Sequence, residues 1–380
     1  MRLQLIATMA FGLEAVVKRE IENLGYEILS TENGKVTFAG DQRAVVRANL
    51  WLRSADRVLI CLDEFHVTEP EELFQRVGGM EWEKWIPMDG RFVVTCTTVK
   101  SALRSEPNNQ KTIKKAIALR LGDFYGLEQM PESGVEYVIK ASFLKDRLTL
   151  TLDTTGESLH KRGYRVKTVP APVKETLAVA MIQLTYWREG RLLVDPCCGS
   201  GTIPIEAALI GRNIAPGLTR HFAAENWDLW SKELWKEERQ RAYSLMEYDK
   251  DIRIAAGDID KGAVAAAKAN AEEAGVDDCI KFFSGDAAKL KALEDYGIMV
   301  TNPPYGQRIG EKTEIQRLYK GFHRFFHDNP TWSLFTITTD RTIEEKIMAR
   351  KADRRRKLYN GRLEVTYYQF HGQRPPRRND

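Results

Sequence analysis

Hydrophobic residues recur along the chain with two different periods, and each period predicts one type of element. Segments 3–7, 35–39 and 58–62 are short apolar or alternating runs, which are typical of strands. Segments 12–24 and 44–51 carry apolar residues three and four positions apart, as one face of a helix does. The first 65 residues are therefore predicted to form a small module in the order β-α-β-α-β.

Residues 66–155 predict a second module of mixed helices and strands. Its expected elements are helices at 69–77 and 108–121, a strand at 91–97, and a hairpin at 135–143 and 147–153. On charge alone, a solvated surface is the favoured interpretation of the polar face of helix 108–121. That face carries four basic residues, Lys111, Lys114, Lys115 and Arg120.

A linker is predicted at 156–172, where two prolines stiffen the backbone. Its basic residues Lys161, Arg162 and Arg165 either contact a partner or are solvated. From residue 173 onward, strand-like and helix-like periods alternate, which is typical of an α/β domain. A tryptophan-rich insert at 222–248 is predicted as a helix packed on this domain, with a base-stacking surface as the alternative.

Two short runs at strand ends carry the chemistry of this domain. The first, 194–202, reads Val-Asp-Pro-Cys-Cys-Gly-Ser-Gly-Thr and connects a buried strand to a helix. Its glycines allow a ligand to approach the backbone closely, because no Cβ intervenes. The free N–H groups at the start of the helix attract polar or anionic groups.

The second run, 301–306, reads Thr-Asn-Pro-Pro-Tyr-Gly and follows another apolar strand. Each residue before a proline is kept out of the α region, so Asn302 and Pro303 are expected to be extended. The result is a stiff loop that holds an amide, a carbonyl and an aromatic ring in fixed relation. A flat, polar, aromatic substrate with an exocyclic amine needs this set of groups.

Together the two runs resemble class I methyltransferases that use S-adenosyl-L-methionine (SAM) and act on exocyclic base nitrogens, above all those that methylate guanine N2 or adenine N6 in RNA. Residues 66–155 resemble a THUMP domain, an RNA-binding module, mainly through Ser101, Ser105, the run 110–117 and the closing hairpin. The resemblance implies a ferredoxin-like domain at 1–65, a THUMP domain at 66–155, a linker at 156–172, and a Rossmann-like, seven-stranded methyltransferase domain at 173–380.

The resemblance also implies roles for particular residues. The catalytic residues are Asn302, Pro303, Pro304 and Tyr305. The cofactor-binding residues are Thr176, Asp195, Pro196, Cys197, Gly199, Gly201, Thr202, Asp258, Ile259, Asp286, Ala287 and Asn302. The RNA-binding residues are Lys111, Lys114, Lys115, Arg120, Lys161, Arg162, Arg165 and Arg308.

Two of these assignments have structural alternatives. Asp258 is expected to bind the ribose hydroxyls, because a carboxylate just past the second strand does so in doubly wound folds. Its neighbour Asp260 is an alternative N-cap for the next helix. Asp286 is expected at the adenine amine, with a plain helix cap as the alternative.

Composition limits the partners, metal sites and cellular location that the protein can have. The formal net charge of +4 permits a nucleic-acid partner without requiring one. Five cysteines without a C-x-x-C pair argue against a disulfide framework or a zinc site and fit a reducing cytoplasm. His323 and His327 lie four apart, but no carboxylate motif accompanies them, so no metal is expected. No apolar run is long enough for a signal peptide or a membrane span.

The resemblance is closest to the bacterial enzymes that make N2-methylguanosine in large-subunit (23S) ribosomal RNA. Some of these enzymes carry a second methyltransferase domain, for which this chain leaves no room, so a single modification is expected. Guanine N2 in tRNA and adenine N6 remain alternative targets. A non-enzymatic RNA-binding assembly factor that retains a methyltransferase shell is an alternative from another class. The oligomeric state is not predicted.

Overall fold

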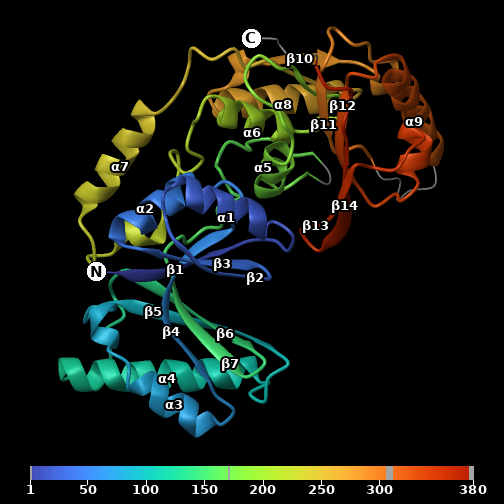
Figure 1. Ribbon diagram of the computed structural model, residues 1–380. Coiled ribbons are helices and arrows are strands. Elements are labelled where there is room, and N and C mark those ends of the chain that lie inside the picture. The colour runs from blue at the N-terminus through green and yellow to red at the C-terminus, as the bar shows by residue number, and fades with distance from the viewer. Residues whose placement is uncertain (1, 170–171, 305–310, 376–380) are drawn as a thin grey trace.

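The computed structural model describes residues 2–169, 172–304 and 311–375. The chain is built on two seven-stranded sheets, one in each half of the sequence. Figure 1 shows the N-terminal half below, in blue and green, and the C-terminal half above, in green to red. The fold is therefore of the α/β class, with an α+β N-terminal half, as the sequence predicted.

The first module is ferredoxin-like. Its elements follow in the order β1 (Leu3–Thr8), α1 (Glu14–Asn23), β2 (Ile28–Glu32), β3 (Lys35–Gly40), α2 (Gln42–Trp51) and β4 (Arg57–His66). Sequence analysis missed β2, because four of its five residues are exposed and no apolar alternation marks it. β2 is an edge strand that pairs antiparallel with β3. With β2 included, the order is β-α-β-β-α-β, the ferredoxin-like arrangement.

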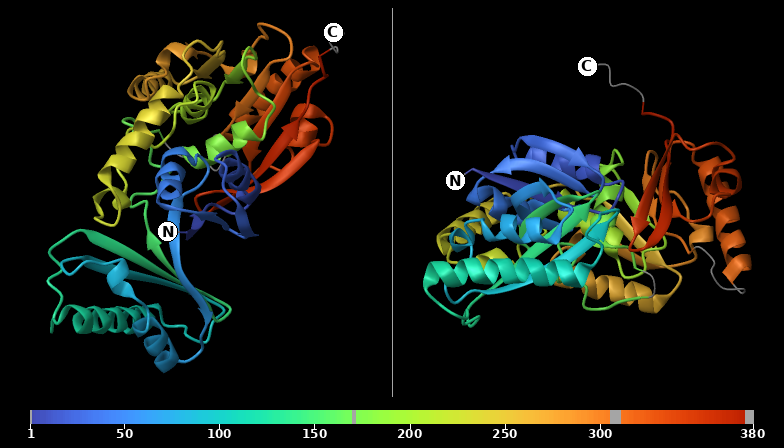
Figure 2. Two further views of the ribbon diagram at one scale, coloured as in Figure 1. Left: turned by 60° about the vertical axis from the view of Figure 1, so that its left-hand side comes forward. Right: turned by 90° about the horizontal axis from the view of Figure 1, so that it is seen from below.

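The second module shares its sheet with the first. Its elements are α3 (Pro70–Gly78), η1 (Trp82–Lys84), β5 (Arg91–Val99), α4 (Glu106–Tyr125), β6 (Glu136–Leu144) and β7 (Arg147–Asp153). The long strand β4 pairs with β1 at one end and with β7 at the other, giving the order β2-β3-β1-β4-β7-β6-β5. The left view of Figure 2 shows β4 running from one body into the other.

The predicted hairpin is confirmed. Lys145 and Asp146 connect β6 to β7, and both have positive φ, +52° and +63°. A two-residue turn of this type matches the right-handed twist of the strands it joins. The turn residues therefore fix the register of this pair.

The C-terminal sheet has the order β10-β9-β8-β11-β12-β14-β13, and its first five strands are parallel. These are β8 (Leu193–Asp195), β9 (Ile254–Asp258), β10 (Ile280–Ser284), β11 (Ile298–Thr301) and β12 (Ser333–Thr338). The antiparallel strands β13 (Arg354–Asn360) and β14 (Leu363–Phe370) close the sheet. The strand order reverses at β8, which lies between β9 and β11 and opens a crevice at the carboxyl ends.

The helices of this half are α5 (Glu175–Gln183), α6 (Thr202–Gly211), α7 (Lys232–Ser244), α8 (Lys261–Glu273) and α9 (Glu311–Asp328), with short turns η2 (Ala223–Asn226), η3 (Asp277–Cys279), η4 (Ala287–Lys289) and η5 (Glu344–Met348). Helix α5 ends at Gln183. The hydroxyl of Thr185 bonds to the carbonyl of Ile182 and accepts from the N–H of Trp187. Such local side-chain bonds compete with helix continuation.

The tryptophan-rich insert connects the two halves. Trp227 stacks on Tyr137 of β6 with ring centroids 5.2 Å apart, and its indole N–H donates to the carbonyl of Glu136. On α7, the buried Glu238 accepts from Arg43 of α2 at 2.5 Å. Trp227, Trp230 and Trp235 are all buried. The insert is therefore packed, as predicted, but against the N-terminal half as well, and these rings offer no base-stacking surface.

Arg162 of the linker is buried, contrary to a solvated or RNA-contacting role. Its side chain is 3% exposed and donates to Glu206 of α6 and to the carbonyl oxygens of Leu159 and Arg53. Tyr164 donates to the same carboxylate at 3.0 Å. A buried arginine needs such partners, because burying an unpaired charge costs several kcal/mol. Arg162 therefore joins the two halves instead of facing a partner.

Glu20 of α1 makes the second buried connection. Its carboxylate accepts from the N–H groups of Arg53 and Ser54, from the Ser54 hydroxyl, and from the Gln183 amide of α5. Burial raises the pKa of this carboxyl, and the hydrogen bonds from Ser54 oppose that rise. We expect Glu20→Ala to lower the free energy of unfolding by about 3 kcal/mol, because it leaves buried donors without an acceptor.

Urea unfolding of the variant measures this loss. The matched control is Glu22→Ala on the exposed face of the same helix, which should change stability by less than about 0.5 kcal/mol. Equal stability of the two variants would show that the Glu20 contacts do not hold the halves together.

Candidate functional site

The carboxyl ends of four neighbouring parallel strands meet at one edge of the C-terminal sheet. Asp195 ends β8, Asp258 ends β9, Asp286 follows β10, and Asn302 follows β11. Because these strands are adjacent, their terminal side chains border the same crevice. The two sequence runs that were singled out follow β8 and β11, which are neighbours in the sheet.

The glycine turn after β8 packs against the end of β9. Gly199 donates its N–H to the Asp258 carboxylate at 3.0 Å, and Cys198 donates to the carbonyl of Gly257 at 2.8 Å. Gly201 has φ +87°, and a Cβ there would lie 3.0 Å from the Cβ of Ala267 on α8. Glycine is therefore required both for the turn and for the close approach of α8.

Asp195 is the buried acid of the site, with 1% of its surface exposed. It accepts from the Thr301 hydroxyl at 2.8 Å and from the N–H of Cys197 at 3.2 Å. Burial raises the pKa of Asp195 to about 7; the two hydrogen bonds oppose this rise and the carboxylate of Asp258 adds to it. Burial likewise raises the pKa of the Cys197 thiol, so this cysteine is not a thiolate nucleophile. Pro196 lies buried between the two.

Asp258 and Ile259 present a polar and an apolar group side by side. The Asp258 carboxylate is half-buried and also accepts from the N–H of Asp260. Asp260 caps α8 by accepting from Gly262, so the predicted N-cap alternative is its observed role. Ile259 is 64% exposed. A large exposed aliphatic side chain therefore lies next to a carboxylate at this strand end.

Asp286 acts as a cap in this structure. Its carboxylate accepts from the N–H of Ala288, one residue beyond Ala287 in η4, and forms an ion pair with Arg317 of α9 at 3.3 Å. These contacts favour the capping alternative. The side chain is nevertheless at the rim of the crevice, next to the end of β10.

The second motif begins where β11 ends. Asn302 is half-buried, Pro303 is buried and Pro304 is exposed. The hydroxyl of Thr301 bonds to Asp195, so the strand end that carries Asn302 is tied to the acid at the end of β8. Tyr305 and Arg308 lie outside the described residues.

The linker crosses the glycine turn, a feature that sequence analysis missed. Arg165 donates to the carboxylate of Glu175 at 2.9 Å and to the hydroxyl of Thr202 at 3.0 Å, so it contributes to packing and not to a basic surface. Asn270 of α8 is fully buried, and its amide donates to the carbonyls of Lys167 and Ser200. The only sequence signal for Asn270 was an asparagine within an alanine-rich helix.

Thr176 faces the N-terminal half. It is buried at the start of α5, and its hydroxyl lies 3.5 Å from the carboxylate of Asp56. The side chain therefore takes part in the contact between the halves, and the structure gives it no separate link to the crevice.

The expected basic face of α4 is exposed, but carboxylates neutralise part of its positive charge. Lys111, Lys114 and Lys115 are exposed. Lys114 pairs with Glu132 at 3.3 Å, and Arg120 forms an ion pair with Glu83. Lys161 pairs with Glu157 at 2.7 Å. Of the predicted RNA-binding residues that the structure describes, Lys111 and Lys115 are the ones without an ion pair.

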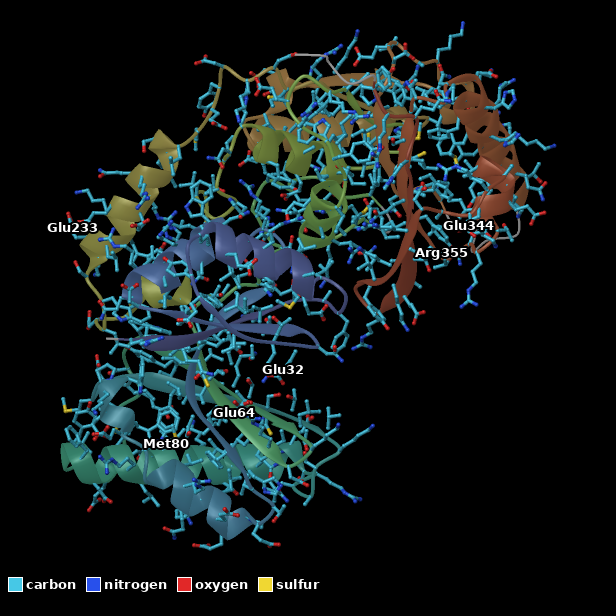
Figure 3. All side chains as sticks on the ribbon, in the orientation of Figure 1. Glu32, Glu64, Met80, Glu233, Glu344 and Arg355 are labelled. Carbon is cyan, nitrogen blue, oxygen red and sulfur yellow. The ribbon has the colours of Figure 1, made fainter. Side chains whose placement is uncertain are left out.

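Two of the four basic residues of β13 are likewise paired. Arg355 forms an ion pair with Glu344, and Figure 3 shows these two labelled residues close together below α9. Lys357 pairs with Glu364 at 2.6 Å. These residues therefore add little uncompensated positive charge.

Within the described ranges, no group of three or more histidine, cysteine, aspartate or glutamate residues is arranged to hold a metal ion. A search of the same residues finds no helix long and apolar enough to cross a membrane.

Three family models match successive parts of the chain. Residues 4–59 match the RlmL ferredoxin-like domain, residues 67–153 match the THUMP domain, and residues 162–369 match the RMKL-like methyltransferase domain. The last match alone covers more than half of the chain.

Curated relatives span the whole chain. YpsC of Bacillus subtilis, described as a candidate RNA methyltransferase, is 45% identical over 98% of this chain and 97% of its own length. Ribosomal RNA large subunit methyltransferase K/L of Syntrophotalea carbinolica is 33% identical over 97% of this chain. The match covers 53% of that relative, so this chain spans about half its length.

Two solved structures have the same fold over the full length. SMU.472, described as a candidate methyltransferase in complex with SAH, is 42% identical with a TM-score of 0.93, and the match covers 99% of each chain. A Listeria monocytogenes protein described as an expected N6-adenine-specific DNA methylase is 44% identical with a TM-score of 0.93 and covers 98% of this chain and 97% of its own.

The crevice is chemically suited to SAM and to its product SAH. The glycine turn and the carboxylates of Asp195 and Asp258 match the polar parts of these molecules, and the exposed Ile259 matches an apolar part. The chain belongs to the RMKL-like methyltransferase family, with an RlmL-type ferredoxin-like domain, a THUMP domain and SAM as its cofactor.

Proposed function

We propose that this protein methylates the exocyclic N2 of a guanine in RNA, with 23S ribosomal RNA as the substrate. The observation that carries the proposal is the position of Asn302 and Pro303. They follow β11 directly, at the strand end that the Thr301 hydroxyl joins to the Asp195 carboxylate of the neighbouring β8. A base amine held by these two residues would lie next to the cofactor.

The proposed cofactor residues are those at the strand ends. The backbone of the turn 196–202 would receive the amino-acid part of SAM, with Asp195 as the nearest buried negative charge. Asp258 would bind the ribose hydroxyls, and Ile259 would cover the adenine. Asp286 and Ala287 would border the adenine amine. When bound, SAM supplies a methyl group that its positively charged sulfur already activates.

The residues of the second motif would orient the base and raise the electron density on its amine. A guanine N2 is a weak nucleophile, because its lone pair is delocalised into the ring. The Asn302 amide oxygen and the Pro303 carbonyl would accept its two N–H bonds and favour a pyramidal nitrogen. Pro304 stiffens the loop, and Tyr305 would stack on the base. Orientation of the reacting groups supplies much of such catalysis.

RNA is supported as the substrate class by the THUMP domain and by the described activity of YpsC. Ribosomal RNA is supported by the K/L relatives and by the RlmL-type N-terminal module. The target base would need to be unpaired or flipped to reach the Asn302 loop. Arg308, shortly after that loop, is proposed as a further RNA contact.

Adenine N6 is the second candidate, and tRNA is an alternative RNA. The Asn-Pro-Pro-Tyr arrangement suits either exocyclic amine, and the Listeria relative is described as an adenine methylase. A non-enzymatic assembly factor is disfavoured, because both glycines, Asp258 and Asn302 are in place. Titration with SAM distinguishes the assembly factor from the enzyme, because a methyltransferase fold without activity would bind RNA but not the cofactor.

The raised pKa of Asp195 predicts pH-dependent cofactor binding. Above about pH 7 the carboxylate is charged and attracts the cationic groups of SAM, while below it the protonated acid does not. We expect SAM affinity to weaken as pH falls from 8 to 6, by up to about tenfold per pH unit below the pKa. Isothermal titration calorimetry across this range measures the effect.

Asp195→Asn keeps the acceptor for Thr301 and Cys197 but removes the titrating charge. Its SAM affinity should be lower at pH 8 and nearly independent of pH. Asp277→Asn, at an exposed aspartate of η3, should bind like the parent protein. An unchanged pH dependence in Asp195→Asn would contradict the assignment.

Asn302→Ala tests the proposed role of the amide in catalysis. The variant should lose about 100-fold or more in kcat, a loss typical of removing one polar group that acts on the reacting centre. SAH should still bind to the variant, because the glycine turn and the carboxylates are intact. Full activity of Asn302→Ala would refute the role, and Asn23→Ala, exposed at the end of α1, serves as the control.

The substrate is tested by nucleoside mass spectrometry on ribosomal RNA and tRNA from cells with and without the gene. Loss of N2-methylguanosine from large-subunit RNA alone is the expected result. Loss from tRNA, or loss of N6-methyladenosine, would keep the mechanism and change the substrate. No change in either RNA pool would favour the binding-factor alternative.

A further inference from the structure

A hollow with a basic lining lies beside the proposed cofactor site. It has a volume of about 230 Å³ and lies between η4 and the middle of α9. Its charged lining residues are Lys289, Arg317, Lys320, Arg324 and Asp286. Four cations therefore surround one carboxylate, and neither the glycine turn nor the Asn302 loop includes them.

The hollow depends on a glycine in the middle of α9. A Cβ at Gly321 would lie 2.3 Å from the Cα of Ala288 and 2.5 Å from its carbonyl oxygen, so only glycine allows η4 to approach this closely. Arg317, Gly321 and Arg324 follow one another at intervals of four and three residues, which places them on one face of the helix. The close approach brings this face, with Lys320 beside it, against Lys289 of η4.

Most of the positive charge in the hollow is uncompensated. Arg317 pairs with Asp286 at 3.3 Å, which neutralises one of the four cations. Arg324 donates to the carbonyl of Ala288, a neutral partner. Among the residues that the structure describes, no carboxylate forms an ion pair with Lys289, Lys320 or Arg324. All three side chains are exposed and available to an anion.

The position of the hollow indicates which anion it receives. Asp286 borders both the hollow and the rim of the cofactor crevice. The run of sequence that begins at Asn302 leads into α9, and Arg317 is six residues into that helix, about 9 Å along its axis. SAM contains no phosphate, so its adenosine end does not need these cations. A nucleic-acid strand whose base enters at Asn302 would bring phosphates to this side.

We propose that Lys289, Lys320 and Arg324 bind a backbone phosphate of the substrate RNA, next to the nucleotide whose base is methylated. This inference rests on the proposed function and extends it. It assigns to α9 and η4 an RNA contact separate from the THUMP domain. The contact would hold the strand at the catalytic domain itself, while recognition elsewhere selects the RNA.

The test compares RNA binding by the full-length parent protein and by the double variant Lys289→Gln, Lys320→Gln. The probe is an unmodified 23S rRNA transcript, with SAH present, at several salt concentrations. The variant should bind roughly three- to tenfold more weakly at moderate salt, and its salt slope should be shallower by about 0.7 for each lost phosphate contact. SAH affinity should be unchanged, because neither lysine is among the proposed cofactor-binding residues.

The matched control is Lys232→Gln, Lys236→Gln on α7, which lies on the opposite side of the molecule from α9 (Figure 1). RNA binding by this control should equal that of the parent. Three outcomes would each overturn the proposal. The Lys289→Gln, Lys320→Gln variant could bind like the parent, both variants could lose the same affinity, or the parent could fail to bind this RNA. Methyl transfer from labelled SAM is measured separately. If the Lys289→Gln, Lys320→Gln variant loses RNA affinity but the parent transfers no methyl group, the proposed function fails while the phosphate site stands.

Discussion

The site depends on one constraint, that the parallel strands of the C-terminal sheet end at the same edge. Pairing of Val194 with Ala255 on one side and with Met299 on the other sets the register of β9, β8 and β11. That register brings a carboxylate, a glycine turn and an amide together from segments about a hundred residues apart. It also buries Asp195 at the centre, and this burial is the physical cause of its raised pKa.

The linker couples this edge to the N-terminal half. Arg162 and Glu206 pair in the interior, while Arg165, a few residues later, contacts Thr202 at the start of α6. Buried charges are costly unless they are paired, so these contacts permit few relative orientations of the two halves. The shared strand β4 extends the same connection into the THUMP domain. We infer that an RNA bound to the THUMP domain would meet the catalytic edge in a defined geometry.

The distribution of charge matters more than its total in this protein. A net charge of +4 is small for an RNA-binding chain. Many arginines form internal contacts or surface ion pairs. Arg355 with Glu344 and Arg120 with Glu83 are examples. The cations without an ion pair include Lys111 and Lys115 on α4 and three side chains around the hollow of α9. Both places lie on surfaces where the proposed function requires contact with phosphates.

Much of this protein could be predicted from its sequence, because local patterns carry the information. The periods of apolar residues indicated most strands and helices, and the positive φ at the Lys145–Asp146 turn agrees with the predicted hairpin. The motifs after β8 and β11 indicated the family, since glycine and proline act on the backbone wherever they occur. The exposed edge strand β2 escaped detection, because its pairing with β3 and not its own pattern makes it a strand.

What only the tertiary structure decided is the role of each polar side chain. Arg162 and Arg165 read as surface charges in sequence, but their partners Glu206, Glu175 and Thr202 are supplied by helices that fold over them. Asp260 and Asp286 have the same residue type as Asp258, yet both cap helical turns. The need for glycine at position 321 is visible only where η4 meets α9. The sequence determines elements through local backbone preferences, whereas burial and partner choice depend on contacts between residues distant in the chain.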